Sequence, residues 1–140
     1  MKKTIVILVL LISTLTISNA QNNDYNDITT TVSYYLDGGT NNDFETVKKA
    51  FHEKAMMKFV TKDGYKEVNA IEFFKRVIKP GPKQNRKTSI QSITIDGNIA
   101  VAKLEIEYPT FFFIDQMSLL KINGIWKVVN KIYYRKNKNN

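Results

Sequence analysis

The chain contains no cysteine and only one histidine, His52. The lack of thiols excludes disulfides, cysteine-ligated zinc, thiol catalysis and a lipidated N-terminal cysteine. A single imidazole excludes a histidine-rich metal site, and no group of carboxylates has the spacing of metal ligands. The sequence also has no glycine-rich phosphate loop and no serine in a nucleophile elbow. We therefore predict that the protein holds no metal and no cofactor.

Acidic residues are outnumbered, with 13 Asp+Glu against 21 Lys+Arg and a formal net charge of +8 over 140 residues. Apolar residues make up 43 %, which is ordinary for a globular domain. The sequence carries no motif for DNA or RNA binding, so we predict no nucleic-acid partner. The basic excess favours solubility, and weak attraction to an anionic surface is the alternative interpretation.

The N-terminal segment has the order of a secretory signal. Lys2 and Lys3 precede the apolar run 5–12, and a polar stretch then ends in Ser18-Asn19-Ala20. The run is much shorter than the roughly 20 apolar residues that a membrane span needs, although an uncleaved anchor is the alternative. We predict cleavage between Ala20 and Gln21 and export to the periplasm or the medium. The predicted organisation is a signal over 1–20, one domain over 21–134 and a basic polar tail over 135–140.

Helical patterns dominate the first part of the mature chain. Apolar spacing predicts a helix over 27–36 that is capped by Asp27 and ends before Gly38-Gly39. A second short helix is predicted from an N-cap at Asn42, with Phe44, Val47 and Phe51 on its apolar side. A third helix is predicted after Asn69, with Glu72 as its capping partner. Pro80-Gly81-Pro82 ends it. Its buried residues are expected among Phe73, Phe74, Val77 and Ile78.

Strand patterns dominate the rest. Residues 55–60 and 65–68 flank Asp63-Gly64 and predict a hairpin. Strand 89–95 turns at Asp96-Gly97 into strand 99–108, and strand 111–122 turns at Asn123-Gly124 into strand 125–134. Asn-Gly between alternating residues is a strong hairpin signal. The combination of these helices with an antiparallel sheet predicts an α+β fold in which the helices cover the sheet.

The two-residue turn at Asn123-Gly124 fixes which side chains share a face of the last hairpin. Pairing without interruption predicts a mostly apolar face toward the helices: Phe113, Asp115, Met117, Leu119, Trp126, Val128, Asn130, Ile132 and Tyr134. Asp115 and Asn130 are polar groups on this face, and a carboxylate there is costly unless it is hydrogen-bonded or hydrated. The opposite face mixes apolar residues with Lys127 and Lys131. It is a candidate homodimer surface or a solvated sheet face.

Several stretches resemble the nuclear transport factor 2-like superfamily, in particular its branch described as "putative lumazine-binding". The similar stretches are Tyr35-Leu36-Asp37-Gly38, Asn41-Asn42-Asp43, Ala50-Phe51-His52, 95–105 and 115–131. They span nearly the whole mature chain, and one departure is Glu53, where the branch usually has proline. The resemblance implies three helices packed in the concave face of a curved antiparallel sheet. Members of the superfamily include isomerases, dehydratases, cyclases and non-catalytic binding or dimerisation modules, so the fold alone does not fix an activity.

The resemblance gives the candidate residues their roles. His52 falls near the mouth of a pocket, and the alternative is a surface histidine that interacts with a helix end. Superfamily isomerases use a pocket carboxylate in proton transfer, which makes Asp115 a candidate acid or base, and a structural carboxylate that accepts hydrogen bonds from Tyr34 or Tyr35 is the alternative. The predicted pocket lining is Tyr34, Tyr35, His52, Phe113, Asp115, Met117, Trp126 and Asn130. Core packing is the alternative role for the aromatic members, and the alternative role for Asn130 is satisfying a buried neighbour.

The leading hypothesis is an exported, non-catalytic protein that binds a small apolar or aromatic molecule and forms a homodimer through the outer sheet face. A second hypothesis is a proton-transfer enzyme that uses Asp115 and His52. A third is a structural or dimerisation module, which a core filled by Phe113, Met117 and Trp126 would favour.

Overall fold

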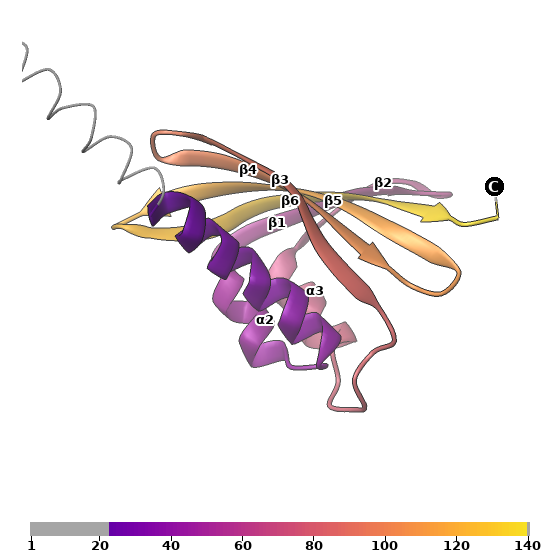
Figure 1. Ribbon diagram of the computed structural model, residues 1–140. Helices are drawn as coiled ribbons and strands as arrows, with labels where there is room; N and C mark the ends of the chain where they lie inside the picture. The colour runs from indigo at the N-terminus through magenta and orange to yellow at the C-terminus, as the bar shows by residue number, and fades with distance from the viewer. Residues whose placement is uncertain (1–22, 140) are drawn as a thin grey trace, which may run out of the picture.

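The computed structural model describes residues 23–139, so the predicted signal and its cleavage site at Ala20 and Gln21 lie outside the described residues. A helix covers 23–40. It is followed by α2 (Phe44–Ala50), β1 (Phe51–Thr61), β2 (Gly64–Asn69), α3 (Ala70–Val77), β3 (Lys87–Asp96), β4 (Ile99–Glu107), β5 (Phe111–Ile122) and β6 (Ile125–Asn137). The helices lie on one face of the sheet (Figure 1), which confirms the α+β class. None of the helices within 23–139 is long and apolar enough to cross a membrane.

The strands form one curved, open, six-stranded sheet in the order β2-β1-β6-β5-β4-β3. Every neighbouring pair is antiparallel except β1 and β6, which run parallel. The sheet is therefore mixed: four of its five strand pairs are antiparallel, as predicted, and one is parallel. The sequence predicts three hairpins, and the two strands of a hairpin are antiparallel. Because β1 and β6 are far apart in the sequence, no turn fixes their relative direction, and they can run parallel.

The first helix is longer than predicted at both ends. It is already helical at residue 23, so Asp27 lies inside it and is not its N-cap, and Gly38 and Gly39 lie in its last turns instead of after its end. A Cβ atom on Gly38 would lie 2.7 Å from the backbone nitrogen of Val47, and one on Gly39 would collide with the guanidinium of Arg86. Both glycines therefore allow close packing: Gly38 lets α2 approach the first helix, and Gly39 leaves space for the Arg86 side chain.

The ends of α2 also differ from the prediction. Asn42 takes a left-handed conformation with φ of 55°, and Asp43 is the N-cap that accepts the amide of Thr46 at 3.1 Å. Phe51, expected on the helix, is instead the first residue of β1 and is buried. The helix therefore starts one residue later, because Asp43 is the side chain that reaches a free amide of the first turn.

The cap of α3 and the last hairpin turn follow the sequence. Asn69 accepts the amide of Glu72 at 3.0 Å, and the helix ends at Val77 before the prolines. The turn residues Asn123 and Gly124 both have positive φ, at 50° and 81°. Between β3 and β4, Asp96 pairs with Ile99, so the turn lies one residue later than predicted.

The register of the last hairpin departs from the prediction after Val128. Leu119 pairs with Val128, but Ser118 pairs with Asn130, so Val129 is an extra residue in a β-bulge. A one-residue slip exchanges the two faces of a strand. Lys131 and Tyr133 therefore turn toward the helices, while Ile132 and Tyr134 are 44 % and 66 % exposed.

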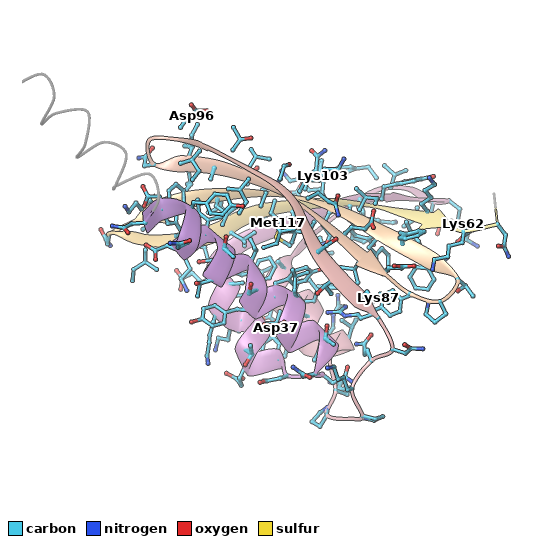
Figure 2. All side chains as sticks on the ribbon, viewed as in Figure 1. Asp37, Lys62, Lys87, Asp96, Lys103 and Met117 are labelled. Carbon is cyan, nitrogen blue, oxygen red and sulfur yellow. The ribbon has the colours of Figure 1, made fainter. Side chains whose placement is uncertain are left out.

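The prediction of inward-facing Asn130, Ile132 and Tyr134 is wrong for this reason. The inward alternation on β5 holds throughout, because Asp115, Met117 and Leu119 are all buried. Met117 lies on the side of the sheet that carries the helices, and Lys103 lies on the other side (Figure 2). The strand β6 also continues through Arg135 to Asn137 in pairing with β5, so part of the predicted tail belongs to the sheet.

Replacing Gly38 with alanine should destabilise the fold by about 1–2 kcal/mol, because the added methyl group collides with the backbone of α2. Without the collision, alanine would stabilise a helix interior by about 1 kcal/mol relative to glycine. A decrease in the free energy of unfolding would therefore be due to the collision. Urea denaturation measures the change. Gly81→Ala, whose Cβ would have ordinary contacts at 3.7 Å, is the matched control. Equal stabilities of the two variants would contradict the close approach.

Candidate functional site

A buried ion pair lies at the centre of the helix-facing side of the sheet. The ammonium of Lys131 lies 2.8 Å from one carboxylate oxygen of Asp115, and their side chains are 4 % and 0 % exposed. The hydroxyl of Tyr35 donates to the other carboxylate oxygen at 2.8 Å. Removing two charges from water is costly, and such a pair persists only when neighbouring groups satisfy it. Asp115 thus has a donor on each oxygen.

The electrostatics of the pair follow from burial. Burial raises the pKa of the Tyr35 phenol well above its ordinary value, and the Asp115 charge acts in the same direction. Burial lowers the pKa of Lys131, although Asp115 opposes that shift. The Lys131 ammonium also lies 4.4 Å from the centroid of the Tyr133 ring, within cation–π distance. Tyr35 therefore keeps its proton at neutral pH and donates it to Asp115.

Arg86 forms a second polar cluster at the carboxyl end of the first helix. Its Nε donates to Thr40 Oγ1 at 2.9 Å, one Nη donates to the Leu36 carbonyl at 2.8 Å and the other to Tyr108 Oη at 3.1 Å. A cation at this end of a helix is favourable, because the last carbonyls lack helical partners. All three acceptors are neutral, and no carboxylate within 23–139 lies in ion-pair distance of this guanidinium.

Two adjoining cavities separate these clusters, and we call them together the aromatic cavity. Their volumes are about 300 Å³ on the Arg86 side and about 100 Å³ on the Lys131 side. Both are walled by the same four aromatic residues: Tyr35, Phe73, Phe74 and Phe113. The larger part is also lined by Gln84 and Tyr108, and the smaller part by Met57 and Tyr133. The larger volume matches the lower end of small-molecule sites, which span about 300–1,000 Å³.

Only part of the predicted pocket lining comes together here. Tyr35 and Phe113 line the aromatic cavity. Asp115 lies behind Tyr35 with no exposed surface. Met117 and Trp126 are fully packed in the core, where the Trp126 indole donates to Asp24 at 3.0 Å.

The remaining predicted residues lie elsewhere. Tyr34 is 37 % exposed on the outside of the first helix, with the Lys49 ammonium 5.7 Å from its ring centroid. His52 is on β1, where its Nδ1 accepts the amide of Lys54 at 3.1 Å. Asn130 pairs across from Ser118 as a result of the bulge. Its Oδ1 is buried without a hydrogen-bond partner within the described part of the chain.

Sequence reasoning missed the polar groups that define the site. Arg86 and Gln84 lie in the loop between α3 and β3, where nothing in the sequence indicates what they contact. Lys131 was placed on the outer face because the bulge at Val129 has no sequence signal. Phe73 and Phe74 were expected as buried residues of a helix, and they serve as cavity walls as well.

The comparisons with known proteins agree with this fold. The family model described as "Putative lumazine-binding" matches residues 23–134. A nuclear transport factor 2-like protein of unknown function from Shewanella baltica superposes with a TM-score of 0.73 at 29% identity, covering 81% of this chain and 94% of that one. Another from Methylobacillus flagellatus has a TM-score of 0.71 at 29% identity, with coverages of 81% and 92%.

A more distant structure shares the fold alone. A ketosteroid isomerase-like protein from Erwinia carotovora atroseptica superposes with a TM-score of 0.62 at 12% identity, covering 77% of this chain and 92% of that one. No match was found among curated proteins.

Removing the ammonium of Lys131 should cost the fold about 3–5 kcal/mol, because Lys131→Met leaves the Asp115 charge buried and uncompensated. Urea denaturation measures the loss, and Lys136→Met, which removes an exposed charge from the same strand, is the control. Adding Asp115→Asn to Lys131→Met should recover most of the stability. The account is contradicted if Lys131→Met is no more harmful than Lys136→Met.

Proposed function

Because this chain belongs to the "Putative lumazine-binding" family of nuclear transport factor 2-like proteins, we propose that its aromatic cavity binds a small aromatic molecule that carries a negative charge. The observation that carries the proposal is the Arg86 guanidinium in the wall of the larger cavity. Its partners are a carbonyl and two hydroxyl oxygens, so its charge is not neutralised by a carboxylate within 23–139. A bound anion would supply the missing countercharge through a charge-assisted hydrogen bond.

The rest of the cavity supports an aromatic ligand. Phe73, Phe74 and Phe113 present ring faces and edges, and Tyr108 and Gln84 add a few polar atoms. Convergence of many apolar atoms with a few fixed polar groups is the usual composition of a small-molecule site. Lys131 contributes little net charge, because Asp115 lies 2.8 Å from its ammonium. The electrostatic preference of the cavity therefore comes from Arg86.

Binding without catalysis fits this geometry better than proton transfer by Asp115 and His52. A general base must reach its substrate within about 3 Å, directly or through one water. Asp115 has no exposed surface and two short hydrogen bonds, and His52 is occupied by the amide of Lys54 on β1. Neither residue is among those that line the aromatic cavity.

The charge of Arg86 should determine affinity for an anionic aromatic probe. We expect Arg86→Gln to weaken the binding of anilinonaphthalene sulfonate about tenfold, since a hydrogen bond to a charged group contributes about 1.5–3 kcal/mol. Fluorescence titration measures the dissociation constant. Arg76→Gln removes an exposed arginine from α3 and is the matched control.

Because Arg86 also holds the first helix, circular dichroism should first establish that the variant is folded. A second variant, Val77→Trp, fills the cavity from an exposed position on its rim and should abolish probe binding while the arginine stays in place. Undiminished probe binding in both variants would contradict the proposed site. It would favour a purely structural or dimerisation module.

We further propose that the helix-free face of the sheet forms a homodimer. Ile99, Val101 and Leu120 are 51 %, 48 % and 38 % exposed, on neighbouring strands of this face. A hollow of about 290 Å³ runs between them. Contiguous exposed apolar surface of this kind favours a partner surface.

A charge in the centre of this face should separate the subunits. We expect the protein to elute as a dimer in size-exclusion chromatography with light scattering, and Val101→Glu to elute as a monomer, since a charge buried in an interface is costly. Tyr25→Glu places the same charge on the helical layer and should leave the dimer intact. A Val101→Glu protein with the mass of the parent would contradict the interface.

We also propose export, on the basis of the basic, apolar and small-residue order of residues 1–20. The mature protein should begin at Gln21. N-terminal peptide mass spectrometry of the protein recovered from the producing cell would check this start, and recovery of a chain that retains Met1–Ala20 would contradict it.

A further inference from the structure

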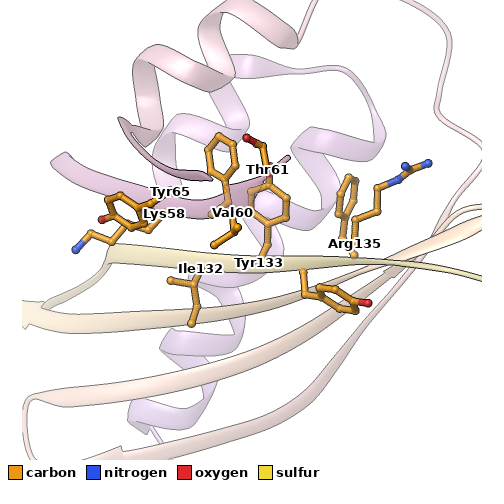
Figure 3. Close-up of a pocket in the computed structure, with 10 residues that line it drawn as sticks. Lys58, Val60, Thr61, Tyr65, Ile132, Tyr133 and Arg135 are labelled. Atoms are coloured by element: carbon orange, nitrogen blue, oxygen red, sulfur yellow. The ribbon is translucent and has the colours of Figure 1, made fainter. Parts of the chain in front are cut away.

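A large hollow lies where β1 and β6 separate, and we call it the edge slot. Its volume is about 760 Å³. Consecutive residues of both strands line it: 58–61 from β1 and 132–135 from β6, with Tyr65 of β2 and Phe113 of β5. Figure 3 shows Tyr133 of β6 pointing to the side where Val60 and Thr61 of β1 lie, whereas Ile132 points to the other side of β6.

The pairing of the two strands explains the slot. Lys58 and Ile132 are the last pair of the parallel ladder between β1 and β6. Beyond it, residues 59–61 of β1 pair only with β2, and residues 133–137 of β6 pair only with β5. The edges that face one another therefore have no backbone ladder between them in the described part of the chain.

Unpaired edges of this kind can accept a further strand. An edge strand presents alternate amide and carbonyl groups, and proteins usually protect such edges with charges, prolines or a covering segment. Residues 59–61 of β1 contain neither a charge nor a proline, and the Phe59 ring packs against the Tyr133 ring of β6 with 5.1 Å between their centroids. Addition of an extended peptide to a free edge is an established mode of recognition, in which backbone hydrogen bonds supply affinity and side-chain contacts supply selectivity.

The side chains of the slot indicate the composition of such a peptide. Val60, Tyr65 and Tyr134 are 79 %, 62 % and 66 % exposed, so the slot offers apolar surface to a partner. Its charged lining residues are Lys58, whose ammonium already lies 4.0 Å from the Glu67 carboxylate of β2, and Arg135. The guanidinium carbon of Arg135 lies 4.1 Å from the ring centroid of Phe111, and no carboxylate within 23–139 is in ion-pair distance of it.

We propose that the edge slot binds an extended peptide segment in which acidic and apolar residues alternate. Its backbone would pair with the free edge of β1 or β6, and alternate side chains would lie on opposite faces of the sheet. Arg135 pairs with the inward-facing Phe113 and therefore lies on the helix side of the sheet, whereas Val60 and Tyr134 lie on the other side. The acidic side chains would meet Arg135 on the helix side, and the apolar ones would contact Val60 and Tyr134 on the other. The slot and the smaller part of the aromatic cavity share Phe113 and Tyr133, but Arg86 lines only the larger part of the cavity, so peptide binding in the slot does not depend on Arg86.

A labelled six-residue peptide of alternating glutamate and valine, capped at both ends, is the probe. Fluorescence anisotropy with the purified protein should give saturable binding at or below about 1 mM. Two matched peptides identify the source of affinity. The same peptide N-methylated at alternate residues cannot complete a backbone ladder, and one in which lysine replaces glutamate reverses the charge; each should bind at least about tenfold more weakly.

Two protein variants locate the site. Arg135→Glu reverses an exposed charge in the slot and should weaken binding of the glutamate peptide at least about tenfold. Lys136 is the next residue on the same strand but lies outside the slot, so Lys136→Glu should change the affinity for this peptide by less than about threefold. The proposal is overturned if the glutamate peptide does not bind. It is also overturned if the methylated peptide binds equally well, which would indicate adsorption to apolar surface, or if the two variants behave alike.

Discussion

The structure depends on a buried pair of opposite charges, Asp115 and Lys131, held under the helices by a single bulge in β6. The extra residue Val129 turns Lys131 inward, where the Asp115 carboxylate lies 2.8 Å away. A buried carboxylate without this cation would be strongly unfavourable. The bulge and the pair therefore require each other, and Tyr35 completes the arrangement by donating to the second carboxylate oxygen.

The same pair also affects the electrostatics of the aromatic cavity. At one end of the cavity, Lys131 and Tyr35 are both hydrogen-bonded to Asp115, so the ammonium there already has a countercharge. At the other end, Arg86 joins the first helix to the loop before β3 and still carries an unneutralised charge within the described chain. This guanidinium donates to the Leu36 carbonyl near the end of the helix, and the proposed preference of the cavity for anions rests on the same group.

Much of the fold could be predicted from local sequence signals, because caps, turns and alternation act over a few residues. The Asn69 cap, the Asn123-Gly124 turn and the inward face of β5 follow from such signals. The candidate site was harder to predict from the sequence. A bulge has no sequence signature, so the register failed after Val128. Arg86 gains its role from a helix end formed by Leu36 and Thr40, which lie far away in the sequence, and only the tertiary fold brings them together.

The chemical reactivity of the lysines on β6 tests the bulge and the buried pair most directly. In brief reductive methylation of the folded protein, followed by peptide mass spectrometry, Lys136 is exposed and should be modified, while Lys131 should remain unmodified until the protein is unfolded. Modification of Lys131 as rapid as that of Lys136 would place its ammonium in solvent and would contradict the account.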